Sequence, residues 1–258
     1  MCIKRISNVA RFVVFLSIFV VVPMSARARA VQHPMTPRSV LWIAAHPDDE
    51  SIVAPLLMRW CVDEGARCTL LILTRGEAGI CRIASGCAPD IAAVRSAEAG
   101  SASQLFHANL ILLTLPDGGG AAPPAWPADL AATLAKYIEA VHPDLILTFD
   151  PRHGTTCHPD HRAAGAAVLD SVKSLPFAPA VWLLETRVDT MPSLQFRPAT
   201  NAAFRFDGSW DAVVEDMQRH ASQFDAAFIA AVQNVSDRAV YLAPAGAILK
   251  EPVEPCER

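Results

Sequence analysis

Two short strings of the sequence combine imidazole and carboxylate side chains at a spacing that suits metal-dependent hydrolysis. The first is Ala45-His46-Pro47-Asp48-Asp49-Glu50, and the second is His158-Pro159-Asp160-His161. Neutral imidazoles and carboxylates are ordinary ligands of Zn²⁺, and a second carboxylate near the ion could accept a proton from water. Taken alone, each string also fits a plain helix start, where an Asp caps the helix and acidic side chains favour its dipole.

The segments around these strings predict an α/β fold with one ligand crevice. Short apolar runs that read as buried strands alternate with stretches of helical spacing. The strands are expected at 40–45, 68–74, 110–115, 145–149, 181–185 and 203–206, and the helices at 51–63, 90–106, 128–141, from about 158, and at 210–223. This order predicts a three-layer, Rossmann-like, mostly parallel sheet with helices on both faces. Ligands bind beyond the carboxyl ends of such strands.

The two strings are expected to meet in that crevice, because each follows the end of a predicted strand. His158 and His161 are three residues apart at a predicted helix start, so they share one face of the helix. One or both could therefore reach an ion held by His46 and Asp49. Pro47 stiffens the turn between those two residues by restricting its own backbone and that of His46.

The first thirty residues have the three-part layout of a secretory signal peptide. Lys4, Arg5 and Arg11 precede an apolar run at 12–22, and Ala28-Arg29-Ala30 offers small residues for cleavage. The run is too short for the ~20 residues that a spanning helix needs. We therefore expect an exported protein, periplasmic or extracellular, in which residues 31–258 form a single domain without a stable membrane span. An uncleaved anchor is the alternative.

Charge and cysteine content agree with export and disfavour nucleic acid as a partner. The leader holds five of the 22 basic residues and none of the 26 acidic ones, which leaves a net charge of −9 after cleavage. Nucleic-acid binding depends on basic groups facing phosphates. The even number of cysteines after the leader indicates disulfides; they are Cys61, Cys68, Cys81, Cys87, Cys157 and Cys256. The pair Cys81–Cys87 is favoured because it flanks a short loop, and Cys61–Cys68 is the second choice.

The complete pair of strings resembles the LmbE-like superfamily of zinc-dependent N-deacetylases, which includes the N-acetylglucosaminyl-phosphatidylinositol de-N-acetylases. The likeness extends in the same order over about residues 38 to 235. Less specific pieces support it, namely Thr74-Arg75-Gly76-Glu77-Ala78-Gly79, Arg95-Ser96-Ala97-Glu98-Ala99, Leu115-Pro116-Asp117-Gly118 and His220-Ala221-Ser222-Gln223.

The resemblance implies an open metal site with a carboxylate base. His46, Asp49 and His161 would hold Zn²⁺, with Fe²⁺ and Co²⁺ as alternative ions. Three protein ligands and a water are typical of a catalytic zinc site. Asp48 would be the general base, because zinc lowers the pKa of its bound water towards ~7.

Two further catalytic roles and three substrate contacts are implied in the same way. A protonated His158 would stabilise the oxyanion, and Asp160 would orient His158. Glu77, Arg95 and Asp117 would approach sugar hydroxyls. Each of the three also has an ordinary structural alternative: an acceptor within a loop, a helix ion pair with Glu98 or Asp90, and a turn residue.

One departure from the family pattern concerns the residues before the second string. Some family members place a Tyr there that assists the reaction, whereas this chain has Thr155-Thr156-Cys157. Cys157 is expected in a disulfide rather than as a thiolate ligand. The remaining histidines, His33, His107, His142 and His220, show no partner pattern.

The function favoured by the sequence is removal of the acetyl group from an N-acetylglucosamine-type sugar conjugate. An amidase acting on a different small amide and a catalytically silent carbohydrate-binding protein are the alternatives. A redox protein is disfavoured because no C-x-x-C occurs. A dinucleotide-binding protein is disfavoured because the first turn is A-H-P-D-D-E in place of G-x-G-x-x-G, and its acids would repel a pyrophosphate. The native glycan and the oligomeric state stay open.

Overall fold

The computed structural model describes residues 36–120, 123–189, 194–200, 202–248 and 256. The predicted signal peptide at 1–30 and His33 therefore lie outside the described residues. Within the described part of the chain, no helix is long and apolar enough to cross a membrane.

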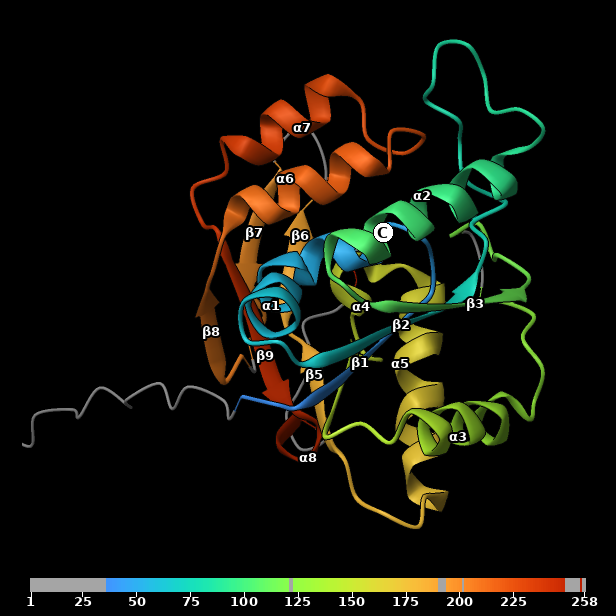
Figure 1. The fold of residues 1–258 in the computed structure, drawn as a ribbon, viewed down its shortest axis with the longest axis vertical. Coiled ribbons are helices and arrows are strands. Elements are labelled where there is room, and N and C mark those ends of the chain that lie inside the picture. Colours follow the sequence, from blue (N-terminus) through green and yellow to red (C-terminus); the bar gives the residue numbers. More distant parts are fainter. Residues whose placement is uncertain (1–35, 121–122, 190–193, 201, 249–255, 257–258) are drawn as a thin grey trace, which may run out of the picture. The chain divides into compact units, whose positions relative to one another are not determined.

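A seven-stranded sheet with the order β3-β2-β1-β4-β5-β9-β8 carries the candidate site (Figure 1). Its first five members in chain order are mutually parallel: β1 (Ser39–Ala44), β2 (Arg67–Thr74), β3 (Asn109–Leu115), β4 (Leu145–Phe149) and β5 (Ala180–Leu184). The strand β9 (Ala239–Pro244) runs antiparallel to β5 and to β8 (Phe204–Asp207). The predicted mostly parallel α/β fold is confirmed.

Helices cover both faces of this sheet, and β1 shows why. Its six residues are all buried, because alternate side chains enter two different cores. Trp42 packs in the core that contains α1 (Ala54–Leu57), α2 (Ile91–Leu105) and α6 (Trp210–Arg219). Ile43 packs in the core that contains α3 (Leu130–Val141) and α5 (Pro159–Ser171).

The segment after β1 differs from the single helix expected at 51–63. It consists of a 3₁₀ turn η1 (Asp49–Val53), a short α1 (Ala54–Leu57) and a π-helical stretch η2 (Met58–Asp63). Pro55 has no amide hydrogen to continue the preceding turn, and Ala54 donates to the carbonyl of Ser51 instead. The last turn of η2 is wider than an α-helical turn. The amide of Glu64 closes it by donating to the Arg59 carbonyl, five residues back, at 3.1 Å.

The later part of the chain was the least well predicted. β5, β8 and α6 lie within a few residues of their expected positions. Sequence reasoning missed β6 (Thr186–Asp189), β7 (Gln195–Pro198), α7 (Ala226–Gln233), β9 and the terminal turn α8 (Ala245–Ile248). β6 and β7 form a separate two-stranded sheet of four-residue strands, which are too short to show a clear alternation. The segment between β4 and α5 also contains one helical turn, α4 (Gly154–Cys157).

The structure contains three disulfides among its described residues, and both expected pairs are confirmed. They are Cys61–Cys68, Cys81–Cys87 and Cys157–Cys256. The third joins residues 99 positions apart and anchors the residue directly before His158. Cys157 is therefore a disulfide partner and not a thiolate ligand.

The two-sided burial of β1 predicts that its core methyl groups contribute strongly to stability. We expect Ile43→Ala to lower the free energy of unfolding by about 3 kcal/mol, because the change leaves a cavity between β1 and α3. Ile80→Ala is the matched control, since Ile43 is fully buried and Ile80 is 77% exposed; its effect should stay below about 0.5 kcal/mol. Urea unfolding measures both values, and similar losses would contradict the packing described.

Candidate active site

The two sequence strings meet because β1 and β4 are neighbours in the sheet. His46 comes directly after β1, and His161 lies in the first turn of α5, just beyond the loop that follows β4. The loops after β2 and β3 complete the surroundings. Together they form a cavity of about 320 Å³, lined by His46, Asp48, Asp49, Ala78, Gly79, Ile80, Arg95, Asp117, Gly119, His158, His161 and Gln223.

The three predicted metal ligands converge on one point of this cavity. His46 Nδ1 lies 3.3 Å from His161 Nε2, and His161 Nε2 lies 3.0 Å from Asp49 Oδ1. His46 Nδ1 approaches the other carboxylate oxygen of Asp49, Oδ2, at 3.7 Å. A tetrahedral ion with bonds of about 2.0–2.2 Å separates its ligand atoms by about 3.3–3.6 Å. Two imidazoles and one carboxylate lying this close together are a donor set of the kind that Zn²⁺ takes.

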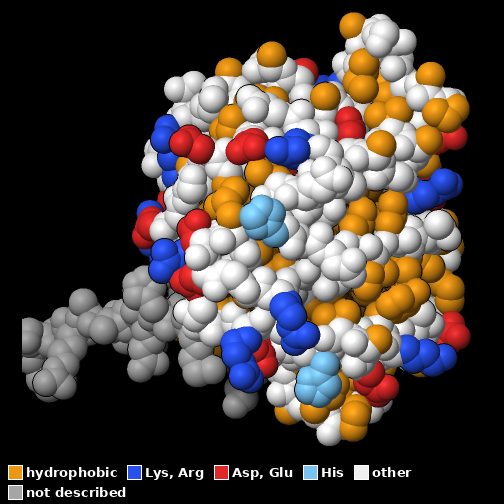
Figure 2. Space-filling model, viewed as in Figure 1, with side chains coloured by type: hydrophobic (Ala, Val, Ile, Leu, Met, Phe, Trp, Pro, Cys, Tyr) orange, Lys and Arg blue, Asp and Glu red, His pale blue; other side chains and the backbone are white. Residues whose placement is uncertain are grey.

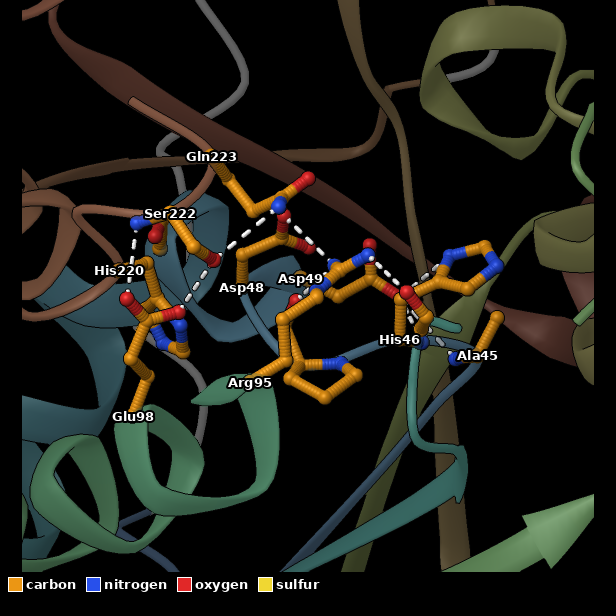
Figure 3. Close-up of polar contacts among 12 residues, drawn as sticks. Ala45, His46, Asp48, Asp49, Arg95, Glu98, His220, Ser222 and Gln223 are labelled. Atoms are coloured by element: carbon orange, nitrogen blue, oxygen red, sulfur yellow. Dashed lines mark hydrogen bonds and ion pairs between the residues drawn. The ribbon is translucent and has the colours of Figure 1, made fainter. Parts of the chain in front are cut away.

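Neighbouring groups turn the lone pairs of these ligands toward that point. Asp49 Oδ2 accepts the amide hydrogens of Ala45 at 3.0 Å and His46 at 2.8 Å, which leaves Oδ1 for an ion (Figure 3). His161 Nδ1 lies 3.0 Å from the Gly154 carbonyl. Because a carbonyl only accepts, that nitrogen carries the proton and Nε2 keeps its lone pair.

Asp48 lies beside the ligands and is held by the buried Arg95. Arg95 Nη2 donates to Asp48 Oδ2 at 2.9 Å and to the Pro47 carbonyl, and its Nη1 donates to the Gly76 carbonyl at 3.1 Å (Figure 3). The alternative helix ion pair with Glu98 or Asp90 was wrong. Burial is the largest influence on Asp48 and raises the pKa of its carboxyl, while the charge of Arg95 opposes that rise.

His158 caps α5 and presents a hydrogen-bond donor to the cavity. Its Nδ1 accepts the amide hydrogen of Asp160 at 3.2 Å, so a neutral ring carries its proton on Nε2. Burial, followed by the nearby His161 and His46, lowers the pKa of His158 to about 4. In its neutral form His158 offers an Nε2–H donor to the cavity, whereas the resemblance implied a protonated ring. Ligand atoms of His46, His158 and His161 also lie within 4.8 Å of one another.

Asp160 supports a different residue from the one expected. Its Oδ2 lies 3.2 Å from His46 Nε2 and accepts the Gly118 amide hydrogen at 2.8 Å, whereas its contact with His158 is through the backbone. The position in the first turn of α5 explains this, because side chains there lean toward the helix N-terminus. Gly118 is required at this approach, since a Cβ would lie 2.5 Å from Asp160 Oδ1. Asp160 thereby fixes the proton on His46 Nε2 and leaves Nδ1 for an ion.

The other two expected substrate contacts occupy different places. Asp117 lines the cavity, with Oδ1 3.4 Å from His46 Nε2 and Oδ2 accepting the Ala78 amide hydrogen at 3.1 Å. Burial disfavours its charge, but hydrogen bonds from His46 and Gly119 hold the pKa of Asp117 below its usual value. Glu77 is exposed, and its Oε1 accepts the Asp117 amide hydrogen at 3.1 Å. It supports the loop beside the cavity rather than lining it.

Sequence reasoning missed a buried ion pair directly behind Asp48. His220 Nε2 lies 2.9 Å from Glu50 Oε1, and Glu50 Oε2 accepts the Asp48 amide hydrogen at 3.2 Å. Asp216 accepts the Ser51 hydroxyl hydrogen at 2.6 Å in the same cluster. Glu50, Asp216 and His220 are all fully buried. The signal was present in the last residue of the first string and in the His220 segment, but no spacing rule joins residues 170 positions apart.

A second buried cluster fixes the loop that carries the second string. Ligand atoms of Asp150, His153 and Glu185 lie within 4.8 Å of one another. Arg152 already forms an ion pair with Asp150 and lies 3.6 Å from Glu185. His153 Nδ1 accepts the Thr155 amide hydrogen at 3.0 Å, so its Nε2 carries the proton toward Glu185. The cluster is thus an ion-pair network in which a guanidinium supplies the positive charge.

The Glu50–His220 pair predicts that stability falls as the pH rises through the alkaline range. Burial opposes the charge on His220, yet Glu50 raises its pKa to about 9. A raised folded pKa stabilises the protein fully below the unfolded value of ~6.5, and this contribution is lost as the pH rises through about 9. We expect His220→Asn to remove a pH-dependent contribution on the order of 3 kcal/mol.

Denaturant unfolding of chelated protein between pH 6.5 and 9.5 measures this slope without interference from bound metal. His107→Asn is the control, because His107 is exposed and its backbone is in a left-handed conformation that Asn tolerates. A wild-type slope that persists in full in His220→Asn would refute the ion pair as its source.

Comparison with known proteins identifies relatives by sequence and by fold. One relative by sequence is a 1D-myo-inositol 2-acetamido-2-deoxy-alpha-D-glucopyranoside deacetylase from Kineococcus radiotolerans. It is 32% identical to this chain over an alignment that covers 48% of this chain and 42% of that protein. The chain spans about half the length of the curated relatives it matches.

Solved structures share the fold. N,N'-diacetylchitobiose deacetylase from Pyrococcus horikoshii aligns with a TM-score of 0.66 at 17% identity, covering 86% of this chain and 90% of that one. GalB, the 4-carboxy-2-hydroxymuconate hydratase from Pseudomonas putida, aligns with a TM-score of 0.62 at 16% identity, covering 84% and 100%. Residues 41–172, half of the chain, match the GlcNAc-PI de-N-acetylase family. The chain therefore belongs to the GlcNAc-PI de-N-acetylase (PIG-L) family.

Proposed function

We propose that this protein is an exported zinc-dependent deacetylase that removes the acetyl group from an N-acetylglucosamine-type sugar conjugate. The observation that carries the proposal is the juxtaposition of the His46, Asp49 and His161 side chains beside the carboxylate of Asp48. Family membership supports the reaction, since several relatives are named as deacetylases of acetamido sugars. In this proposal residues 1–30 are a cleaved leader and 31–258 form one domain. The three disulfides support an oxidising location.

The residues around the cavity divide the chemistry between them. A bound divalent ion would supply a water of lowered pKa and an electrophile for the acetamide oxygen. Asp48 accepts the proton of the attacking water, and Arg95 keeps its carboxylate from turning away. The Nε2–H of His158 donates to the carbonyl oxygen as that oxygen gains negative charge. Asp48 then returns its proton to the amine that leaves.

Supporting residues hold this arrangement before substrate arrives. Asp160 and the Gly154 carbonyl fix the tautomers of His46 and His161. Asp117 and Arg95 line the cavity and are proposed to approach the sugar hydroxyls, and Glu77 contributes by holding Asp117. The preformed geometry lowers the cost of ordering the site during the reaction.

Replacement of Asp48 separates proton transfer from metal binding. We expect Asp48→Asn to keep the wild-type metal content, because Asp48 is not among the three converging ligands, and to lose about 10²–10⁴ in turnover. Acetate release from N-acetylglucosamine glycosides, assayed with added zinc and again after chelation, measures the rate. Undiminished acetate release by Asp48→Asn would exclude Asp48 as the base. A wild-type protein that contains no metal and gains no activity from added zinc would refute the proposed enzymatic function.

The two histidines of the second string should respond differently to removal. We expect His161→Ala to lose metal affinity, because its Nε2 is 3.0 Å from Asp49 Oδ1. His158→Ala should retain metal and lose about 10²–10³ in rate, the cost of one oxyanion donor. Metal analysis of both purified variants checks this division. Equal metal loss would show that His158 is also a ligand.

A further inference from the structure

We propose that the group attached to the sugar, its aglycone, is uncharged and presents an apolar surface to Ile80. The inference rests on the proposed function, which it deepens by naming the class of conjugate. Ile80 is the exposed large hydrophobic side chain of the described residues, with 77% of its surface accessible, and it lines the candidate active site. A lone exposed Ile is ordinary on a protein surface, but this one lies at the mouth of a reaction cavity.

The size of the cavity places the aglycone near Ile80. About 320 Å³ is at the lower end of the ~300–1,000 Å³ found for small-molecule sites. The sugar ring must enter deeply for its acetamide to reach His46, Asp49 and His161. A substituent on the ring then extends outward over the rim, where Ala78 and Ile80 are the apolar lining residues.

The loop that carries Ile80 is held in place from several sides. Gln223 Nε2 donates to the Ile80 carbonyl at 3.3 Å, and the Arg82 amide donates to the Ser222 carbonyl at 2.9 Å. The Cys81–Cys87 disulfide follows directly. Ser222 is itself fixed by Glu98, which accepts its amide hydrogen at 2.8 Å and its hydroxyl hydrogen at 2.6 Å (Figure 3).

This rigidity means that Ile80 is presented to solvent in an ordered position. In Figures 1 and 2, the segment between β2 and α2 projects beyond α2 and exposes hydrophobic side chains along its length. An apolar contact made by a preorganised side chain costs little ordering entropy on binding. The loop is therefore suited to hold an apolar group against the rim.

The charges of the cavity disfavour an anionic aglycone. Among the described residues that line it, Arg95 is the one Lys or Arg side chain. Its guanidinium is 5% exposed and is already used by Asp48, the Pro47 carbonyl and the Gly76 carbonyl. Asp49 and Asp117 add negative charge that a divalent ion would neutralise. No unpaired cation of the described lining is thus offered to a phosphate or a carboxylate.

A series of glycosides of one sugar tests the inference. Methyl and hexyl N-acetylglucosaminides, each as both anomers, and N-acetylglucosamine 1-phosphate are assayed for acetate release with zinc. Partial burial of Ile80 and the alkyl chain should raise kcat/KM for the hexyl glycoside about tenfold over the methyl glycoside. The gain should fall mainly in KM, because the contact is made equally before and during the reaction. The 1-phosphate should be the poorest substrate.

Two variants of the same loop connect this preference to Ile80. Ile80→Ser should reduce the hexyl-to-methyl ratio to near one. Ile83→Ser is the matched control, because Ile83 is in the same loop but outside the cavity lining, and it should keep the wild-type ratio. Equal wild-type rates on both glycosides, an unchanged ratio in Ile80→Ser, or a preference for the 1-phosphate would overturn the inference while leaving deacetylation intact. Absence of acetate release from every glycoside would instead refute the proposed function, and this inference with it.

Discussion

The adjacency of β1 and β4 is the constraint on which the rest of the site depends. Parallel pairing of Val40 with Leu145 through Trp42 with Leu147 places the carboxyl ends of both strands at one edge of the sheet. The chain leaving β1 supplies His46, Asp48 and Asp49, and the chain leaving β4 leads into His158 and His161. Because the helices cover both faces, this edge is where the two segments can meet without crossing a core. The ligands are thus brought together by the sheet and not by their own attraction.

Once assembled, the site is maintained by compensating charges. Burying an ionised carboxylate or imidazole is costly unless a partner or hydrogen bond accompanies it. Asp49 accepts the hydrogens of two backbone amides, Asp48 accepts from Arg95, and Oδ2 of Asp160 contacts His46 and accepts from Gly118. Behind them, Glu50 pairs with His220. Arg95, Asp160 and His220 come from three different parts of the chain, so these contacts connect the segment after β1 to α2, to α5 and to the segment after α6.

Fold and chemistry are carried by different parts of this molecule. The same architecture is found in a chitobiose deacetylase and in a muconate hydratase, at 17% and 16% identity, so it does not by itself define a reaction. The donor set at the carboxyl edge is more selective, because two imidazole nitrogens and the carboxylate of Asp49, at separations of 3.0–3.7 Å, suit metal-assisted hydrolysis when a second carboxylate lies alongside. The rim of the cavity is separate again, and Ile80 on its hydrogen-bonded loop is proposed to contact the conjugate rather than the bond that is broken.

The sequence by itself determined the parallel α/β class, the two local disulfides and the convergence of the two strings, because strand periodicity, loop spacing and the strand-end rule act over short stretches of chain. Tertiary structure alone decided which atoms pair across long separations. It assigned Asp160 to His46, Arg95 to Asp48 and His220 to Glu50, and it added β6, β7 and the Cys157–Cys256 disulfide. These outcomes depend on how helices and loops from distant segments pack around buried charge, which no local pattern of residues encodes.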